Sequence, residues 1–193
     1  ITWSLVGSEM CIRDRGDPVS SSINSQSGST FAGVVAGTEE DYCVLTANNG
    51  YGFIAKIEEL QTKNKSGKTA LNTKGAIPLG PEKLTSIEDS YIAAITEEGK
   101  MLLIEANDLP VLAKGRGNKI INIDKKKFEA KENRLIFLKT LNKGDNLKIY
   151  SGKQSYMIKS KDLENFVGSR GRKGNFLPKG YRRVDKLEVI SEE

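Results

Sequence analysis

A unit of about 50 residues recurs three times along this sequence, over about 42–88, 91–140 and 145–190. Each copy has a glycine at a matching turn and a leucine ten or eleven residues later: Gly50 and Leu60, Gly99 and Leu109, Gly152 and Leu163. A repeat of this length is typical of arrays in which one supersecondary unit cannot bury its apolar face alone. The sequence therefore predicts modules that pack against one another.

Each copy begins with two short apolar segments separated by a turn. In the first copy, Asn48-Asn49-Gly50 follows Val44 and Leu45, and these turn residues tolerate the positive φ of a hairpin; a second strand is expected over 52–57. In the second copy, strands are expected over 91–96 and 101–104, around Glu97-Glu98-Gly99.

The rest of each copy predicts further short elements. EEL, NDLP and KDLEN turn the chain, KTALNT and NKIINI predict additional strands, and FEAKENRLIF is an insertion or a strand. Units of about four short strands predict propeller-like blades or a related closed all-β array.

The segment LVGSEMCIRDR, residues 5–15, fits no helix cap, strand alternation or secretion signal. Back-translated, it reproduces a transposase adapter used in sequencing libraries. We therefore expect residues 1–15 to be an adapter scar, the protein to enter in mid-chain near Gly16 without its natural N-terminal part, and one domain over 16–193; a natural loose terminus is the alternative. The Ser-rich segment 20–30 predicts a loop or a broken strand.

Composition narrows the classes of function. The chain has no histidine, and apart from Cys11 its one cysteine is Cys43, within the apolar run YCVLTA. This argues against a zinc site, a disulfide scaffold and a His-dependent nucleophile. GxSxG and a complete P-loop frame are absent, and no apolar run approaches the roughly 20 residues that span a bilayer. We expect a protein of a reducing compartment, with Cys43 buried.

Positive charge is concentrated in three segments. The net charge is +5, and 18 of the 30 Lys and Arg lie within 63–74, 114–131 and 170–186. Each segment places glycine-spaced cations at one position of the repeat, and loops of this kind can neutralise successive DNA phosphates without reading sequence; the alternative is that they are ordinary solvated loops. The candidate DNA-binding residues are Lys63, Lys65, Lys68, Lys114, Arg116, Lys119, Arg170, Arg172, Lys173, Lys179, Arg182 and Arg183.

Other conspicuous residues have a plainer interpretation. Lys125, Lys126 and Lys127 lie outside the repeated position, and such charge runs are usually solvated turns. The aromatic residues at strand positions are expected to pack in the core or at sheet edges rather than to stack on bases, and these are Tyr51, Phe53, Tyr91 and Tyr156.

A family resemblance rests on the stretches GYGFIAKIEELQTKNKSGKTAL, LPVLAKGRGNKIINI and GSRGRKGNFLPKGYRRVDKLEV. They resemble the C-terminal domain of the bacterial DNA topoisomerase IV A subunit, and the similarity covers nearly all of 16–190. Gyrase A subunits share this domain type, a β-pinwheel whose propeller-like, four-stranded blades exchange strands. The resemblance implies an all-β, partial β-pinwheel with about three to four of the family's five or six blades.

One motif separates the two enzymes. The gyrase A domain carries a QRRGGKG box for wrapping DNA, whereas this sequence has only partial versions at 114–119 and 170–174. This departure favours the topoisomerase IV type. A gyrase A-type wrapping domain remains an alternative, as does a protein-interaction propeller whose basic rim serves solubility or an acidic partner.

The resemblance also implies a function. The domain is expected to bind and bend double-stranded DNA, guiding the choice of transported segment in decatenation and supercoil relaxation. The family's catalytic tyrosine and ATP site lie elsewhere, so no catalytic residue, metal or cofactor is expected in this fragment, although the holoenzyme uses ATP and Mg²⁺. Partners implied through other regions are the B subunit and a second A subunit, in the stoichiometry A₂B₂. The implied location is the cytoplasm, on the nucleoid, and the family leaves peripheral inner-membrane association open.

Overall fold

The computed structural model describes residues 28–191. The expected adapter scar, and the Ser-rich segment up to residue 27, lie outside these residues. The chain divides into two compact units. The small unit contains residues 28–30 and the loop 62–68 of the described chain, and the large unit contains residues 31–61 and 69–191, with all the strands and helices given below.

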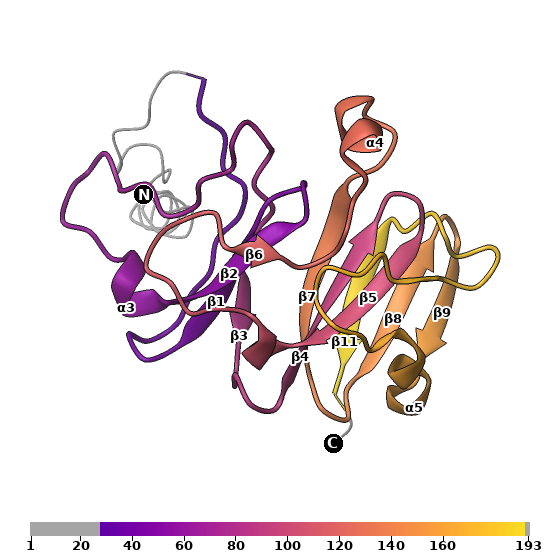
Figure 1. Cartoon of the computed structure of the whole chain (residues 1–193). Coiled ribbons are helices and arrows are strands. Elements are labelled where there is room, and N and C mark those ends of the chain that lie inside the picture. Colours follow the sequence, from indigo (N-terminus) through magenta and orange to yellow (C-terminus); the bar gives the residue numbers. More distant parts are fainter. Residues whose placement is uncertain (1–27, 192–193) are drawn as a thin grey trace, which may run out of the picture. The chain divides into compact units, whose positions relative to one another are not determined.

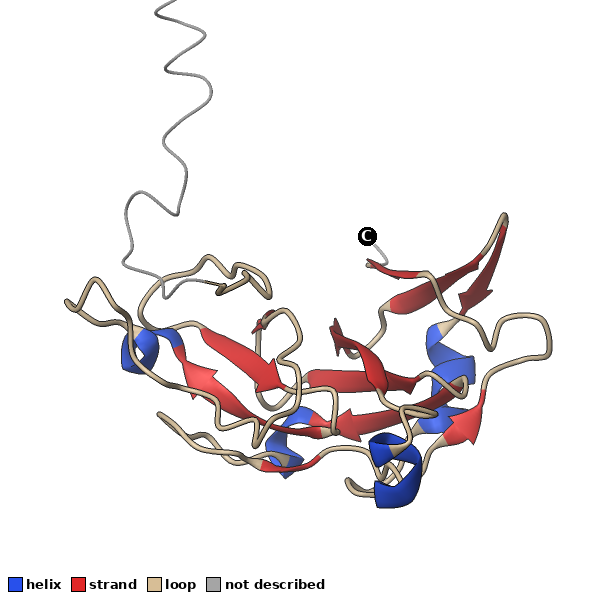
Figure 2. Ribbon diagram, turned by 90° about the horizontal axis from the view of Figure 1, so that it is seen from above, coloured by secondary structure: helices blue, strands red, loops and turns tan. Residues whose placement is uncertain are grey.

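Three antiparallel sheets form the large unit (Figures 1 and 2). The first has the order β3-β1-β2-β6 and consists of β1 (Tyr42–Thr46), β2 (Tyr51–Lys56), β3 (Glu82–Leu84) and β6 (Asn118–Lys119). The second has the order β10-β5-β4-β7 and consists of β4 (Ser90–Thr96), β5 (Lys100–Glu105), β7 (Leu135–Asn142) and β10 (Asn175–Phe176). The third has the order β11-β8-β9 and consists of β8 (Asn146–Ser151), β9 (Gln154–Ile158) and β11 (Lys186–Ile190). The expected all-β class is confirmed.

The two predicted hairpins are confirmed. Gly50 and Gly99 adopt φ values of 80° and 76° and close their turns by donating to the carbonyls of Ala47 and Thr96, both at 2.9 Å. Both second strands start one residue earlier than expected, at Tyr51 and at Lys100. Positive φ at these positions explains why each hairpin turn contains a glycine.

Single turns of helix follow the hairpins. They reverse the chain where EEL, NDLP and KDLEN occur, and they are α3 (Ile57–Leu60), η1 (Ala106–Asp108), α5 (Ser160–Leu163) and η2 (Glu164–Phe166). The remaining helix, α4 (Lys125–Glu129), belongs to the segment between β6 and β7, and the carboxylate of Asp124 caps it by accepting from the amides of Lys126 and Lys127. FEAKENRLIF is therefore the end of α4 followed by the start of β7.

Neighbouring repeats exchange short strands. The second strand of the first hairpin, β2, pairs with β6 through Tyr51↔Lys119, and β5 of the second hairpin pairs with β10 through Lys100↔Phe176. The strands predicted for KTALNT and NKIINI are mostly wrong. KTALNT contributes one isolated bridge, and NKIINI contributes only β6, because the fully buried Ile120 leaves the sheet edge for the core.

The core lies on both faces of the second sheet. Along β4, Ile92 and Ala94 pack in the cluster shared with the first sheet, whereas Ala93 and Ile95 pack in the cluster shared with the third. Alternation along one strand therefore supplies two cores, which explains why β4 is almost wholly apolar. Cys43 and Phe53 are fully buried in a further cluster, as expected for both. Within residues 28–191, none of the helices has the length and apolarity to cross a lipid bilayer.

Candidate nucleic-acid interface

The second basic segment lies beside the chain that continues from the first. The amide of Gly115 donates to the carbonyl of Ala70 at 2.8 Å, and the carbonyl of Gly115 accepts from the amide of Asn72 at 2.7 Å. These two bonds fix the glycine between Lys114 and Arg116 against the strand-like segment around Leu71, to which it forms a parallel bridge.

The third basic segment is joined to the second in a similar way. The amide of Gly171 donates to the carbonyl of Ile120 at 2.7 Å, and the carbonyl of Arg172 accepts from the amide of Asn122 at 2.8 Å. The backbone segments that contain Lys119 and Arg172, two candidate DNA-binding residues, therefore lie side by side.

Two glycines let these segments approach the preceding hairpin. Gly117 has φ 72°, and a Cβ there would overlap the carbonyl of Gly52 in β2. Gly174 has φ 71°, and a Cβ there would overlap the carbonyl of Met101 in β5. Gly52 and Met101 each lie two residues after the turn glycine of their hairpin, so the same close approach occurs in both blades. Glycine in these segments has a packing role, because any side chain would push the loop away from the strand.

The loop 62–68 carries the first group of candidates, Lys63, Lys65 and Lys68. All three are exposed, and the loop is turned by Gly67, whose φ is 74° and whose amide donates to Asn64 at 2.9 Å. These lysines belong to the small unit. The juxtaposition seen in the large unit is therefore that of the second and third segments with the backbone of residues 70–72.

Two cations of the second segment contact the ring of Tyr51 in β2. The guanidinium carbon of Arg116 lies 3.7 Å from the centroid of the Tyr51 ring, and the ammonium of Lys119 lies 5.6 Å from it. Lys119 also donates to the side chain of Asn122 at 3.2 Å, whereas Lys114 is exposed. Tyr51 thus occupies a strand position, as predicted, but its ring also supports a candidate DNA contact.

The third segment and its continuation are more exposed. Arg170, Arg172, Lys173 and Lys179 all extend from loops. Arg182 stacks at 4.4 Å over Phe176, a ring that is 50% exposed and that also carries Lys100 at 4.8 Å. Arg183 lies 3.9 Å from Asp185, with a side chain 93% exposed.

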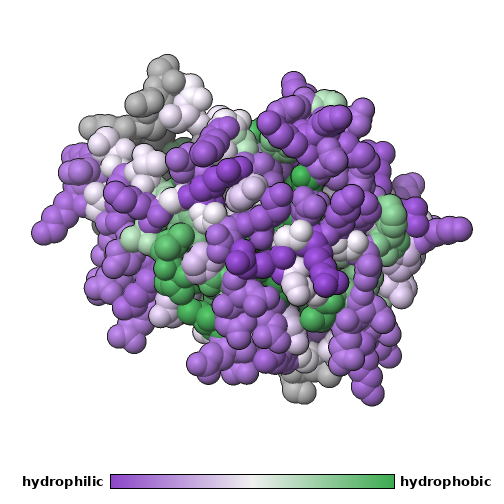
Figure 3. All heavy atoms as spheres, viewed as in Figure 1, coloured by the Kyte–Doolittle hydropathy of each residue, from purple (hydrophilic) through white to green (hydrophobic). Residues whose placement is uncertain are grey.

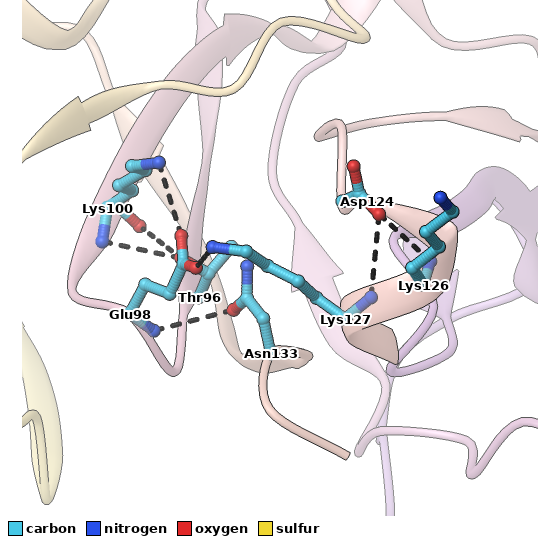
Figure 4. A network of polar contacts seen from close by, with 7 residues as sticks. All are labelled: Thr96, Glu98, Lys100, Asp124, Lys126, Lys127 and Asn133. Carbon is cyan, nitrogen blue, oxygen red and sulfur yellow. Dashed lines mark hydrogen bonds and ion pairs between the residues drawn. The ribbon is translucent and has the colours of Figure 1, made fainter. Parts of the chain in front are cut away.

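Carboxylates neutralise other lysines instead. Figure 4 shows Glu98 between Lys100, at 3.1 Å, and Lys127. The hydrogen bond from Lys127, followed by that from Lys100, holds the pKa of Glu98 below its ordinary value, against the opposing effect of burial. The expectation of a solvated turn at 125–127 is corrected in one respect: the three lysines are exposed, as expected, but they begin the helix α4, and two of them are ion-paired, Lys127 with Glu98 and Lys125 with Glu129 at 3.7 Å.

The candidate cations differ from these lysines in having almost no acidic partners. Within residues 28–191, and leaving Lys68 aside, Arg183 is the one candidate with a carboxylate at ion-pair distance. Hydrophilic side chains cover most of the face seen in Figure 3. Unpaired cations on adjoining loops are positioned to receive an external anion.

Sequence reasoning missed three residues near this surface, Lys74, Lys100 and Phe176. Lys74 lies next to Arg116 and Lys119 in the lining of one hollow, and Phe176 is the ring beneath Arg182. Phe176 could have been identified from its position in the repeat, because it follows the Gly-Asn pair of the third segment just as Lys119 follows that of the second. Among the described residues, no group of three or more His, Cys, Asp and Glu side chains is arranged to hold a metal ion.

Comparison with known proteins gives a consistent family. The model of the DNA gyrase C-terminal domain, a β-propeller, matches residues 41–87 and 90–129. The A subunit of DNA topoisomerase 4 from Pseudomonas aeruginosa is 39% identical over 92% of this chain, and the one from Haemophilus influenzae is 37% identical over 92%. The chain spans about a quarter (24%) of the length of both relatives.

Among solved structures, the Escherichia coli ParC C-terminal domain superposes with a TM-score of 0.81 at 30% identity, covering 92% of this chain and 71% of that one. The arrangement of sheets thus belongs to a known domain type. The chain is a member of the gyrase A C-terminal domain family, as a C-terminal domain of the DNA topoisomerase IV A subunit.

Proposed function

We propose that this domain binds double-stranded DNA through its phosphates, without sequence preference. The observation that carries the proposal is that the second and third basic segments adjoin through backbone hydrogen bonds, while their candidate DNA-binding residues, Arg183 excepted, lack carboxylate partners in the described chain. Each phosphate neutralised by such a cation releases condensed counterions, and this release supplies affinity that depends on charge rather than on bases. No helix of the described chain is long enough to read a major groove, since the longest, α4, has five residues.

Bending of the bound DNA is part of the same proposal. Contacts spread over successive loops can offset the few kcal/mol that a smooth bend of a short site costs. In the intact enzyme, we infer that the domain presents the transported segment during decatenation and supercoil relaxation. The B subunit and a second A subunit would be engaged through other regions in an A₂B₂ assembly that uses ATP and Mg²⁺, in the cytoplasm and on the nucleoid.

Salt-dependent binding to linear duplex DNA tests the proposal. Changing Arg170, Arg172 and Lys173 to Ala together removes three unpaired cations. If each neutralises one phosphate, the slope of log affinity against log salt becomes shallower by about 2.7, at about 0.9 per contact. Fluorescence anisotropy with two duplexes of unrelated sequence measures this slope and reports sequence preference at the same time.

A matched control removes the same charge from elsewhere. Lys56, Lys83 and Lys143 are also surface lysines, but they are ion-paired with Glu58, Asp41 and Asp89. Their triple Ala variant should change the slope by less than about one contact. Equal effects of the two triple variants would mean that net charge alone matters. Binding insensitive to salt would refute phosphate recognition and favour the protein-interaction alternative.

A further inference from the structure

A hollow of about 440 Å³ lies beside Tyr51 in the first blade. The turn between β1 and β2, the loop before β3, the second basic segment and α4 line it, and its charged residues are Lys74, Arg116, Lys119, Lys125 and Glu129. Lys125 and Glu129 pair with each other at 3.7 Å. Three cations in the wall therefore have no carboxylate partner within residues 28–191, and a concave site of this charge favours an anion.

Arg116 is held in place by a ring rather than by a polar partner. Its guanidinium stacks on Tyr51, and its buried Nε has no hydrogen-bond partner among the described residues. A stacked guanidinium keeps its plane fixed, and its terminal N–H groups form a fork that matches phosphate oxygens. The side chain of Arg116 is therefore already ordered before an anion binds, so binding costs little further conformational entropy.

The second blade contains a related arrangement, in which the lysine lies on the hairpin strand β5 and the ring on the exchanged strand β10. There the cross-strand pair is Lys100↔Phe176, with Arg182 also over the ring. Glu98 precedes the turn glycine in that blade and pairs with Lys100, whereas the residue before Gly50 is the neutral Asn49. The aromatic ring with two cations thus recurs, but Lys100 beside Phe176 is ion-paired with Glu98, whereas neither Arg116 nor Lys119 has a carboxylate at ion-pair distance within residues 28–191.

We propose that the hollow beside Tyr51 is a phosphate-binding subsite in which Lys74, Arg116 and Lys119 hold one phosphate group. Tyr51 acts as a positioning residue, since it fixes the guanidinium without touching the anion. The source of the phosphate, a phosphodiester of duplex DNA, rests on the function proposed above. Inorganic phosphate shares this chemistry and serves as an independent probe.

The ¹⁵N–¹H resonance of the Arg116 Nε–H, assigned by its loss in Arg116→Lys, reports on the subsite directly. Sodium phosphate and a linear duplex, added separately to the 193-residue chain, should both shift it. A shift with sodium phosphate in a chain that does not bind duplex would keep the subsite and refute the DNA-binding function. Duplex binding without any shift of this resonance would refute the subsite and leave the function standing.

Variants of Tyr51 test its positioning role. Tyr51→Leu should weaken duplex binding about three- to tenfold, the range expected for loss of a partly desolvated cation–π contact, whereas Tyr51→Phe should retain wild-type affinity. In an Arg116→Ala background, Tyr51→Leu should cause no further loss, because the two residues act as one unit. A full additive loss in that background would overturn the role.

A control ring and a second variant keep the test decisive. Tyr150 also carries two lysines, at 5.0 and 5.3 Å, but one of them, Lys186, is ion-paired with Glu188, so Tyr150→Leu should leave duplex affinity within about twofold. If Tyr51→Leu shows no thermal unfolding transition and is therefore not folded, Arg116→Lys is used in its place in the binding assay. That change keeps the charge and removes the planar fork, and the same three- to tenfold loss is expected; wild-type affinity would refute the proposal.

Discussion

Replacing Gly117 by Ala should destabilise the domain by more than the conformational cost of placing an alanine at positive φ. Gly117 lies at φ 72°, where an L-residue costs about 1–2 kcal/mol. Its added Cβ would overlap the carbonyl of Gly52 and lie 2.9 Å from Cβ of Phe53, so the loop must move off β2. That movement breaks the short β2–β6 pairing, which consists of two residue pairs, and the loss of about one hydrogen bond for each pair would cost about 2 kcal/mol. The expected total is about 3–4 kcal/mol.

The matched control is Gly67→Ala. Gly67 has nearly the same backbone conformation, φ 74°, but nothing lies within 4 Å of the position its Cβ would occupy. Only the conformational cost of about 1–2 kcal/mol is therefore expected. Gly174→Ala repeats the perturbation in the second blade, where the Cβ would overlap the carbonyl of Met101, and should resemble Gly117→Ala.

Urea denaturation followed by circular dichroism measures these differences, and an unchanged m-value confirms that the same transition is being compared. We expect Gly117→Ala to exceed Gly67→Ala by about 2 kcal/mol. If the two variants lost the same stability, the close approach of the loop to β2 would have no energetic weight. The packing role assigned to the glycine would then be wrong.

Leu103→Ala removes a side chain that is 1% exposed in the core between the second and third sheets, and should cost about 2–5 kcal/mol in urea denaturation. Glu98→Gln should destabilise the domain at neutral pH. Because the hydrogen bond from Lys127 lowers the folded-state pKa of Glu98, its stabilisation is present above the unfolded-state pKa of about 4.3 and is lost as the pH falls from there through the lowered folded-state pKa, where the thermal stabilities of wild type and variant should converge. Burial raises the pKa of Cys43 to about 11, so in a Cys11→Ser chain a thiol reagent at pH 8 should label it only after unfolding.

Local features of the fold could be predicted from the sequence. Asn48-Asn49-Gly50 and Glu97-Glu98-Gly99 indicate tight turns because glycine supplies the positive φ, and apolar segments on both sides complete each hairpin. The exchange of strands could not be derived this way. β6 contains only Asn118 and Lys119, and its partner in β2 is distant in the chain, so no local pattern distinguishes it from the loop around it. The neighbouring Ile120 looks like part of a strand but is drawn into the core.

The same division applies to the candidate site. The recurrence of glycine-spaced cations identified the segments, and backbone bonds join the second and third of them. Which lysines are neutralised was not readable, since Lys127 pairs with Glu98 across an interval of 29 residues. The support of Arg116 by Tyr51 was likewise hidden, because it depends on strand exchange placing the segment over β2.

The distribution of ion pairs argues for an external anion more strongly than net charge does. A carboxylate beside a phosphate-binding cation would have to be displaced before DNA could bind, and the bound state would then contain a new repulsion. Most ion-paired acidic residues instead contact lysines that are not candidate DNA-binding residues, such as Lys83 and Lys127. Asn49 and Glu98 occupy the same turn position in successive blades: Glu98 pairs with Lys100, whereas the two cations beside Tyr51 have no carboxylate at ion-pair distance within residues 28–191. Blades of the same architecture can therefore differ in their contribution to DNA binding, since both cations beside Tyr51 are without a carboxylate partner in the described chain, whereas of the two beside Phe176 only Arg182 is.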